Sequence, residues 1–288
     1  MGAFLTKRSI CCNGCYASYV FLGINFSWEC MARYFIELSF DGTNYVGWQS
    51  QLNGLGVQQV LEEKISTIFR EQIELVGCGR TDAGVHAIYY VAHFEIIQHN
   101  VETAKAVYHL NKILPRSIAV KSISPVSDTA HARFDAEERT YRYYITQRKN
   151  PFNDQFAYYY AQLLDEEKMN LAAELLLSMH DFTSFAKLHS DNKTNICTIY
   201  KARWHREERE LLVFTISANR FLRNMVRSIV GTLLDVGRGK LSPEEFVMIA
   251  EQKNRSAAGS SVPAQGLFLV DVKYPAPIFK RNNRQPLE

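Results

Sequence analysis

The chain has 288 residues, of which 47% are hydrophobic and 22% are charged. These fractions are typical of a folded, water-soluble protein and exclude the disordered, collagen-like and coiled-coil classes. The chain has 33 Lys and Arg residues and 30 Asp and Glu residues, which gives a net charge of only +3. A polyanionic partner must therefore bind a local patch of positive charge. The length allows one large domain or two of ordinary size.

The six cysteines are unevenly distributed along the chain. Four of them lie in the first thirty residues: Cys11, Cys12, Cys15 and Cys30. Two of these form a C-x-x-C pair, but a zinc site needs about four nitrogen or sulfur ligands. No histidine precedes His86. We therefore expect no metal site, with a zinc or redox site in this segment as the alternative.

The same thirty residues contain Lys7 and Arg8, followed by an apolar run over 16–26. This run is too short to span a membrane, and no signal-peptidase motif follows it. A well-patterned strand begins directly afterwards, at Met31. We interpret residues 1–30 as an N-terminal extension that is disordered or comes from a misassigned start codon. We expect a cytoplasmic protein with no membrane partner.

Hydrophobic periodicity predicts mixed helices and strands in the first half. Apolar and polar side chains alternate over 34–40, which predicts a strand that ends at the turn Asp41-Gly42. The further elements are a helix at 57–69, strands at 73–76 and 88–96, a helix at 101–114 and a strand at 118–123. Their order is βαββαβ, and Pro115 ends the second helix.

A charged segment over 128–140 separates this half from a second half that again mixes helices and strands. The expected elements are a strand at 141–146, a helix at 165–179, strands at 196–205 and 211–217, a helix at 220–236, a helix opened by Ser242-Pro243-Glu244-Glu245 and a strand at 267–274. We predict an α+β fold of two sandwich-like domains, 31–127 and 128–275, each a mostly antiparallel sheet with helices on one face. A basic tail follows over 276–288.

A glycine-rich segment over 77–86 links two of the predicted strands. It lacks the third glycine and the following helix of a dinucleotide-binding loop, and the chain has no phosphate-binding Gly-Lys-Ser/Thr motif. It places Arg80 two residues before Asp82. Pairing with Arg80 would keep the Asp82 carboxylate ionised, as a nucleophile or base requires. The alternative is a tight turn held by the same ion pair.

Several segments together resemble those of one enzyme family, in the family's order. They are Phe40-Asp41-Gly42-Thr43-Asn44-Tyr45, Gly47-Trp48-Gln49, Gly79-Arg80-Thr81-Asp82-Ala83-Gly84-Val85-His86-Ala87, His131-Ala132-Arg133-Phe134, Tyr141-Arg142-Tyr143, Asp181-Phe182-Thr183-Ser184-Phe185, Phe221-Leu222-Arg223-Asn224-Met225-Val226-Arg227 and Gly266-Leu267-Phe268-Leu269-Val270. The chain resembles the tRNA pseudouridine synthase A family from about residue 33 to 274. One departure is Tyr90, where the family commonly has glutamine.

The resemblance implies an isomerase that breaks the N1–C1′ bond of a uridine in tRNA and rejoins the ring through C5. Its implied targets are positions 38, 39 and 40 in the anticodon stem-loop. The reaction consumes nothing, which implies that no cofactor is needed. The resemblance also implies the pseudouridine synthase fold with a catalytic cleft between the two domains, and a homodimer across which the tRNA lies.

The resemblance assigns roles to individual residues. Asp82 is the catalytic nucleophile or base, and attack on the sugar, attack on the ring and removal of a sugar proton all remain open. Tyr141 would stack on the target base and relay the C5 proton, and Arg80 would fill the place of the flipped base. Arg227 is expected as a second partner of Asp82, and Arg223 as a phosphate contact.

Leu267 and Leu269 would form a wall of the substrate-binding pocket, with an ordinary core position as the alternative. Further phosphate contacts would come from cations interleaved with aromatic residues: Arg133, Arg139, Arg142, Arg148, Lys149, Lys201, Arg203 and Arg206. We expect His86 to bond to the loop backbone and Cys78 to be a small buried residue.

Two other functions compete with the isomerase. A non-catalytic RNA-binding module could use the same sheet, but it has no need of a carboxylate in a glycine-rich loop. A glycoside hydrolase usually needs two carboxylates that face the bond, and the segments that resemble the family single out no second acid. Replacement of Asp82 by asparagine would leave a pure binding module unaffected.

Overall fold

A computed structural model describes residues 20–21, 24–25, 31–51, 54–97, 101–187, 193–207 and 211–278. Within the predicted N-terminal extension it describes two short antiparallel strands, β1 (Val20–Phe21) and β2 (Ile24–Asn25). The four cysteines of that extension and the tail beyond residue 278 lie outside the described residues. None of the helices in the described part of the chain has the length and apolarity that a bilayer-spanning segment needs.

The first half has the predicted βαββαβ order. Its elements are β3 (Ala32–Phe40), α1 (Val57–Phe69), β4 (Val76–Gly77), β5 (His86–Ile96), α2 (Thr103–Ile113) and β6 (Ile118–Pro125). The strand predicted over 73–76 is wrong except at its end. The amides of Ile73 and Leu75 donate to the side chains of Ser66 and Glu62 on α1, so they do not join a strand.

The second half begins with a long strand and ends with another. Its strands and α-helices are β7 (Glu138–Thr146), β8 (Tyr158–Tyr159), α3 (Glu166–Leu175), β9 (Ile199–Glu207), β10 (Leu211–Ala218), α4 (Met225–Gly237), α5 (Pro243–Glu251) and β11 (Leu267–Lys273). Four short 3₁₀ helices are η1 (Leu176–Ser178), η2 (Thr183–Phe185), η3 (Ala264–Gly266) and η4 (Ala276–Ile278). The predicted capping box at Ser242 and Glu245 opens α5.

The helix predicted over 220–236 begins later than expected. Asn224, directly before α4, has a φ of 66°, in the left-handed region. A right-handed helix cannot pass through a residue in that conformation. Arg220 and Arg223 therefore lie in the segment before the helix, and only Arg227 lies on it. The predicted start of this helix at residue 220 is therefore wrong, and the three arginines do not share one helix face.

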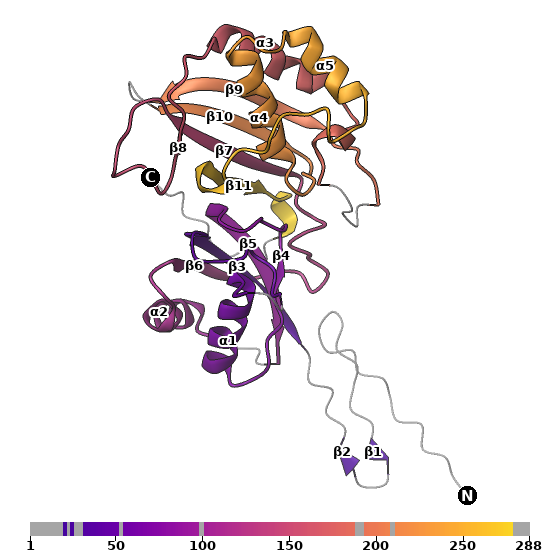
Figure 1. Ribbon diagram of the computed structural model, residues 1–288. Coiled ribbons are helices and arrows are strands. Elements are labelled where there is room, and N and C mark those ends of the chain that lie inside the picture. The colour runs from indigo at the N-terminus through magenta and orange to yellow at the C-terminus, as the bar shows by residue number, and fades with distance from the viewer. Residues whose placement is uncertain are drawn as a thin grey trace, which may run out of the picture.

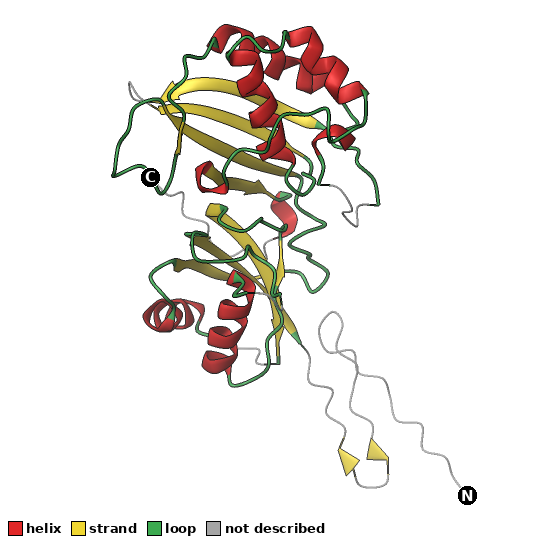
Figure 2. Ribbon diagram, in the orientation of Figure 1, coloured by secondary structure: helices red, strands yellow, loops and turns green. Residues whose placement is uncertain are grey.

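Strands β3 to β11 join into one nine-stranded sheet. Its main order is β6-β3-β5-β11-β7-β10-β9, and β4 pairs with β5 and β8 with β7 at its sides. All of its pairings are antiparallel except β5 with β11 and β7 with β8. Helices α1 and α2 lie beside the β6-β3-β5 half, and α3, α4 and α5 cover one face of the β7-β10-β9 half (Figures 1 and 2). The predicted α+β class with a mostly antiparallel sheet is confirmed.

Two groups of buried apolar side chains lie within this sheet-and-helix framework. One is built from β3, α1, β5 and β6, and the other from β10, α3, α4 and α5. Strand β11 joins them, because Leu269 belongs to the first group and Leu267 to the second. Tyr141 is partly buried and packs against both. The junction of the two cores is therefore the place where β5, β11 and β7 meet.

Candidate active site

The glycine-rich loop between β4 and β5 lies at this junction. Strand β5 begins with His86 and Ala87, which pair in parallel with Phe268 and Leu269 of β11. Gly84 has a φ of 75°, a left-handed conformation that favours glycine. The loop thus turns sharply just before it enters the centre of the sheet. Asp82 lies two residues before Gly84, and its carbonyl accepts a hydrogen bond from the Val85 amide at 3.2 Å.

The path of this loop is set by the segment that follows β3. A side chain at Gly47 would place its Cβ 2.3 Å from the Thr81 carbonyl oxygen, and one at Gly42 would place it 2.0 Å from the Val85 carbonyl oxygen. The Gly84 amide also donates to the Tyr45 carbonyl at 3.2 Å. Backbone lies directly against backbone, so only glycine fits at Gly42 and Gly47.

Asp82 faces two arginines from the second half of the chain. Arg223 Nε lies 3.4 Å from Asp82 Oδ1, and Arg227 Nη1 lies 3.7 Å from Asp82 Oδ2. The Arg227 side chain is fixed in turn, because its Nε donates to the Val262 carbonyl at 2.7 Å. The Asp82 side chain is only 19% exposed. The expected Arg227–Asp82 pair is confirmed, and Arg223 is a second partner of Asp82.

Arg80 does not pair with Asp82. It is exposed and forms no hydrogen bond or ion pair with any other described residue. The predicted Arg80–Asp82 ion pair is therefore wrong, and Arg223 and Arg227 orient the carboxylate instead.

Tyr141 lies at the junction of the two cores, where the negative charge of Asp82 acts on its phenol. It sits on β7, opposite Leu269 of β11, and its ring packs edge-on against Phe221 at 5.1 Å between centroids. Burial raises the pKa of Tyr141 far above its usual value, and the negative charge of Asp82 adds to this shift. The phenol is therefore neutral and keeps its proton. Leu267 and Leu269 are both buried, one in each core.

Comparison with known proteins identifies the family. A model of the tRNA pseudouridine synthase family matches residues 38–135 and 172–275. The chain belongs to the tRNA pseudouridine synthase family. The tRNA pseudouridine synthase A of Bacteroides fragilis is 54% identical over 248 residues, which are 86% of this chain and 98% of that protein. The enzyme of the same name from Caldicellulosiruptor bescii is 39% identical over 85% of this chain and 100% of that protein.

A solved structure titled "Crystal Structure of a Cbf5-Nop10-Gar1 Complex" is similar over 69% of this chain and 54% of that one, with 13% identity and a TM-score of 0.26. That similarity is too low to bear on the fold. The family membership confirms the resemblance read from the sequence and the enzyme class, an isomerase that modifies tRNA.

Two residues hold the glycine-rich loop of this synthase, and only Tyr90 stood out in the sequence. Arg139 was expected at a phosphate, but its guanidinium donates to four carbonyls: Ala136 at 2.7 Å, Asn219 at 2.7 Å, Cys78 at 3.0 Å and Arg133 at 2.5 Å. It thereby joins the start of the glycine-rich loop to the segment before β7 and to the turn before Arg223. These donors are engaged within the protein.

Tyr90 is the second of these residues. Its hydroxyl donates to the Gly79 carbonyl, and its ring stacks on Trp48 at 4.1 Å between centroids. The residue that departs from the family's usual glutamine thus braces the loop from β5. The departure itself was the signal that could have found it.

Of the remaining loop residues, Cys78 is buried as expected, whereas His86 bonds to backbone outside its own loop. His86 is buried and accepts a hydrogen bond from the Gly42 amide at its Nδ1, at 3.1 Å. Burial lowers the pKa of His86, which suits this acceptor role. Burial raises the pKa of the Cys78 thiol to about 11, so it is no nucleophile near neutral pH. Among the described residues, no group of three or more His, Cys, Asp or Glu could hold a metal ion.

The other cations expected at phosphate differ in their surroundings. Arg142 pairs with Glu207 at 3.0 Å, and Arg206 pairs with Glu166. Both charges are thereby partly neutralised within the protein. Arg133, Lys149, Lys201 and Arg203 are exposed.

Proposed function

We propose that the protein isomerises uridine to pseudouridine at positions 38, 39 and 40 of the tRNA anticodon stem-loop. Support comes from its family, and from relatives named tRNA pseudouridine synthase A that it matches over nearly their whole length. The proposal rests on the Asp82 carboxylate. It lies in a loop whose path requires glycine at neighbouring positions, and it is held between Arg223 and Arg227. A single oriented carboxylate is the chemical group that this reaction needs.

The reaction is balanced within one nucleotide. The N1–C1′ bond breaks, a C5–C1′ bond forms, C5 loses its proton and N1 gains one, so no cofactor is consumed. Asp82 acts as the nucleophile or base. The neutral Tyr141 phenol, whose pKa the charge of Asp82 helps to raise, would stack on the target base and relay the C5 proton. Its position at the meeting point of two strands fixes its ring.

The residues around Asp82 have separate roles in binding the substrate. Arg80 is exposed and unpaired among the described residues, so it is free to enter the space that the flipped uridine leaves. Arg223 is half exposed and could turn from Asp82 to a phosphate of the substrate. Leu269 lies opposite Tyr141 in the sheet and Leu267 opposite Tyr143, and both would support the wall of the pocket.

The same proposal extends to the architecture. Residues 31–127 and 128–275 form two domains with the catalytic cleft between them, in keeping with two apolar cores that meet at β11. The protein works in the cytoplasm as a homodimer, with the tRNA lying across both subunits. These bounds leave residues 1–30 and 276–288 outside the two domains, although Ile278 of η4 packs in the first core.

The test is the release of tritium from tRNA transcripts labelled at uracil C5, without added cofactor or metal. The wild type should release tritium, and Asp82→Asn should be slower by about 10³-fold or more. Asp235→Asn is a matched control, because Asp235 is 20% exposed and also pairs with an arginine, Arg238. It should release tritium at the wild-type rate. Wild type that binds tRNA without release would favour the non-catalytic RNA-binding module.

A further inference from the structure

Phe134 is an exposed aromatic residue in the turn over 131–135 that precedes β7. Its side chain is 74% exposed, although burial of a phenylalanine is among the favourable contributions to folding. A single exposed apolar residue is ordinary on a protein surface. Three further observations distinguish Phe134: the turn is rigidly held, its neighbours suit a nucleic-acid base, and it lies beside the catalytic loop.

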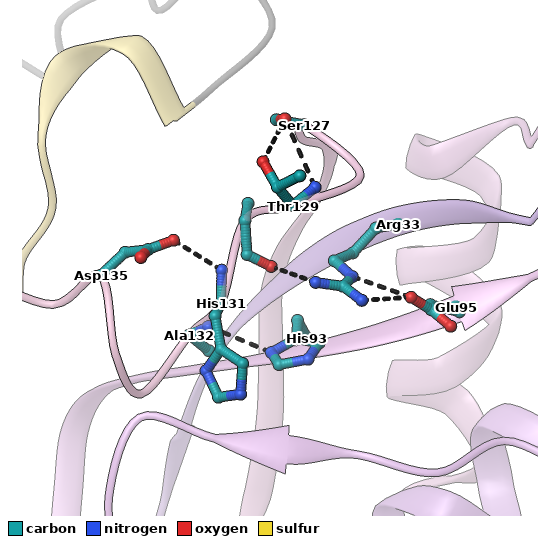
Figure 3. A network of polar contacts seen from close by, with 9 residues as sticks. Arg33, His93, Glu95, Ser127, Thr129, His131, Ala132 and Asp135 are labelled. Carbon is teal, nitrogen blue, oxygen red and sulfur yellow. Dashed lines mark hydrogen bonds and ion pairs between the residues drawn. The ribbon is translucent and has the colours of Figure 1, made fainter. Parts of the chain in front are cut away.

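The turn is anchored by hydrogen bonds from several directions (Figure 3). The Ala132 amide donates to His93 Nδ1 at 3.0 Å, and the His131 amide donates to the Asp135 carboxylate at 2.7 Å. The Phe134 amide itself donates to His131 Nδ1 at 3.3 Å. The aromatic ring is therefore presented on a fixed backbone, and little conformational entropy is lost when a partner binds it.

The neighbours of the ring give it the properties of a stacking platform. The His131 ring lies 4.2 Å from the Phe134 ring between centroids, and the Arg133 guanidinium carbon lies 5.7 Å from the centroid. Arg133 is exposed as well. An aromatic face beside a free guanidinium is the combination that binds single-stranded nucleic acid, with the base on the ring and the phosphate at the cation.

The turn also lies next to the catalytic loop. One nitrogen of Arg139, Nη2, donates to the carbonyls of both Arg133 and Cys78, so these two backbone positions are neighbours. Cys78 lies four residues before Asp82, and the exposed Arg80 lies between them. The turn that carries Phe134 therefore lies close to the loop that would hold the substrate at Asp82.

We propose that Phe134 and Arg133 form a binding platform for a second, unpaired nucleotide of the RNA, next to the target uridine. The base of that nucleotide stacks on Phe134, and its phosphate contacts Arg133. This rests on the proposed function, which makes an RNA loop the substrate. It adds a contact outside the catalytic centre that fixes the position of the RNA backbone while the target nucleotide is flipped.

The experiment measures dissociation constants for a tRNA transcript by filter binding, in the Asp82→Asn background so that the RNA stays unmodified. Phe134→Leu should weaken binding by about tenfold or more, because a base–aromatic stack is lost. Phe134→Trp should keep affinity near that of the parent protein, since indole also stacks. Tyr108→Leu is the matched control: Tyr108 is 57% exposed, with Lys112 Nζ 4.5 Å from its ring centroid, but it lies on α2. It should leave affinity unchanged.

Equal affinity of Phe134→Leu and the parent would overturn the platform, as would equal losses in the leucine and tryptophan variants. An altered oligomeric state in gel filtration, with RNA affinity intact, would assign Phe134 to a protein interface instead. Tritium release by the protein with Asp82 intact is measured in parallel. If release is absent while affinity depends on the Phe134 ring, the proposed isomerisation fails and the RNA platform stands.

Discussion

Gly47→Ala tests whether the segment after β3 determines the geometry of the catalytic loop. The change has two separate costs. Gly47 has a φ of 107°, a conformation that costs a residue with a side chain about 1–3 kcal/mol. In addition, the new Cβ would lie 2.3 Å from the Thr81 carbonyl oxygen, whereas ordinary contact begins near 3.4 Å. Thr81 must therefore move by about 1 Å, and Asp82 is the next residue.

A displacement of about 1 Å at reacting groups can lower a rate by about 10²-fold. We expect Gly47→Ala to lower kcat for tritium release by about that factor and to lower Tm by several degrees. Gly239→Ala is the control, because Gly239 also has a left-handed φ of 73°, but a Cβ at this position would have no atom within 4 Å. It should lose about 1–2 kcal/mol of stability from backbone strain alone and keep its kcat.

Stability is measured by urea unfolding, and kcat at saturating tRNA on the folded protein. The reasoning would be refuted if both variants kept the wild-type kcat. It would also be refuted if Gly47→Ala lost activity only in proportion to its unfolded fraction. Either result would mean that the close backbone approach does not control the position of Asp82.

Two further predictions concern residues that hold the loops around the site. Arg139→Lys should lower stability by about 2–4 kcal/mol in urea unfolding and reduce kcat more than tRNA affinity. The reason is that the ammonium group of lysine cannot donate to all four carbonyls that the planar guanidinium reaches. A variant with unchanged kcat would contradict this. Burial lowers the pKa of His93 to about 4, so the unfolded state binds the proton more tightly than the folded state. Stability should therefore fall as the pH drops from about 6.5 to 4. This group contributes at most about 3 kcal/mol to that fall. His93→Asn keeps an acceptor for the Ala132 amide and should reduce the loss of unfolding free energy at low pH, measured by unfolding at several pH values. An unchanged dependence on pH would exclude His93 as its source.

Local chemistry in the sequence was sufficient to locate most elements and the catalytic loop. Alternation identified β3, and the capping residues identified α5. Arg227 could be assigned because the family resemblance placed it near Asp82. The start of α4 could not be predicted, because the left-handed φ at Asn224 leaves no mark on the apolar periodicity, which continues through it.

The partners of Asp82 and the role of Arg139 were harder to predict for a related reason. Adjacency in sequence suggested Arg80, whereas Arg223 reaches Asp82 from 141 residues away. The four acceptors of Arg139 are backbone carbonyls, and a carbonyl has no signature in a sequence. Contacts between distant segments, and contacts to backbone, emerge only when the sheet is assembled.

The central position of β11 has a consequence for how the protein is made. This strand is the last of the sheet in the chain, yet it lies between β5 and β7. While the nascent chain is still on the ribosome, β5 and β7 each lack that neighbour and present open edges, which invite pairing with other chains. Pairing across such a sequence separation is also slow. Synthesis of the whole chain therefore precedes formation of the site, and a chaperone that shields open strand edges would raise the yield of active enzyme.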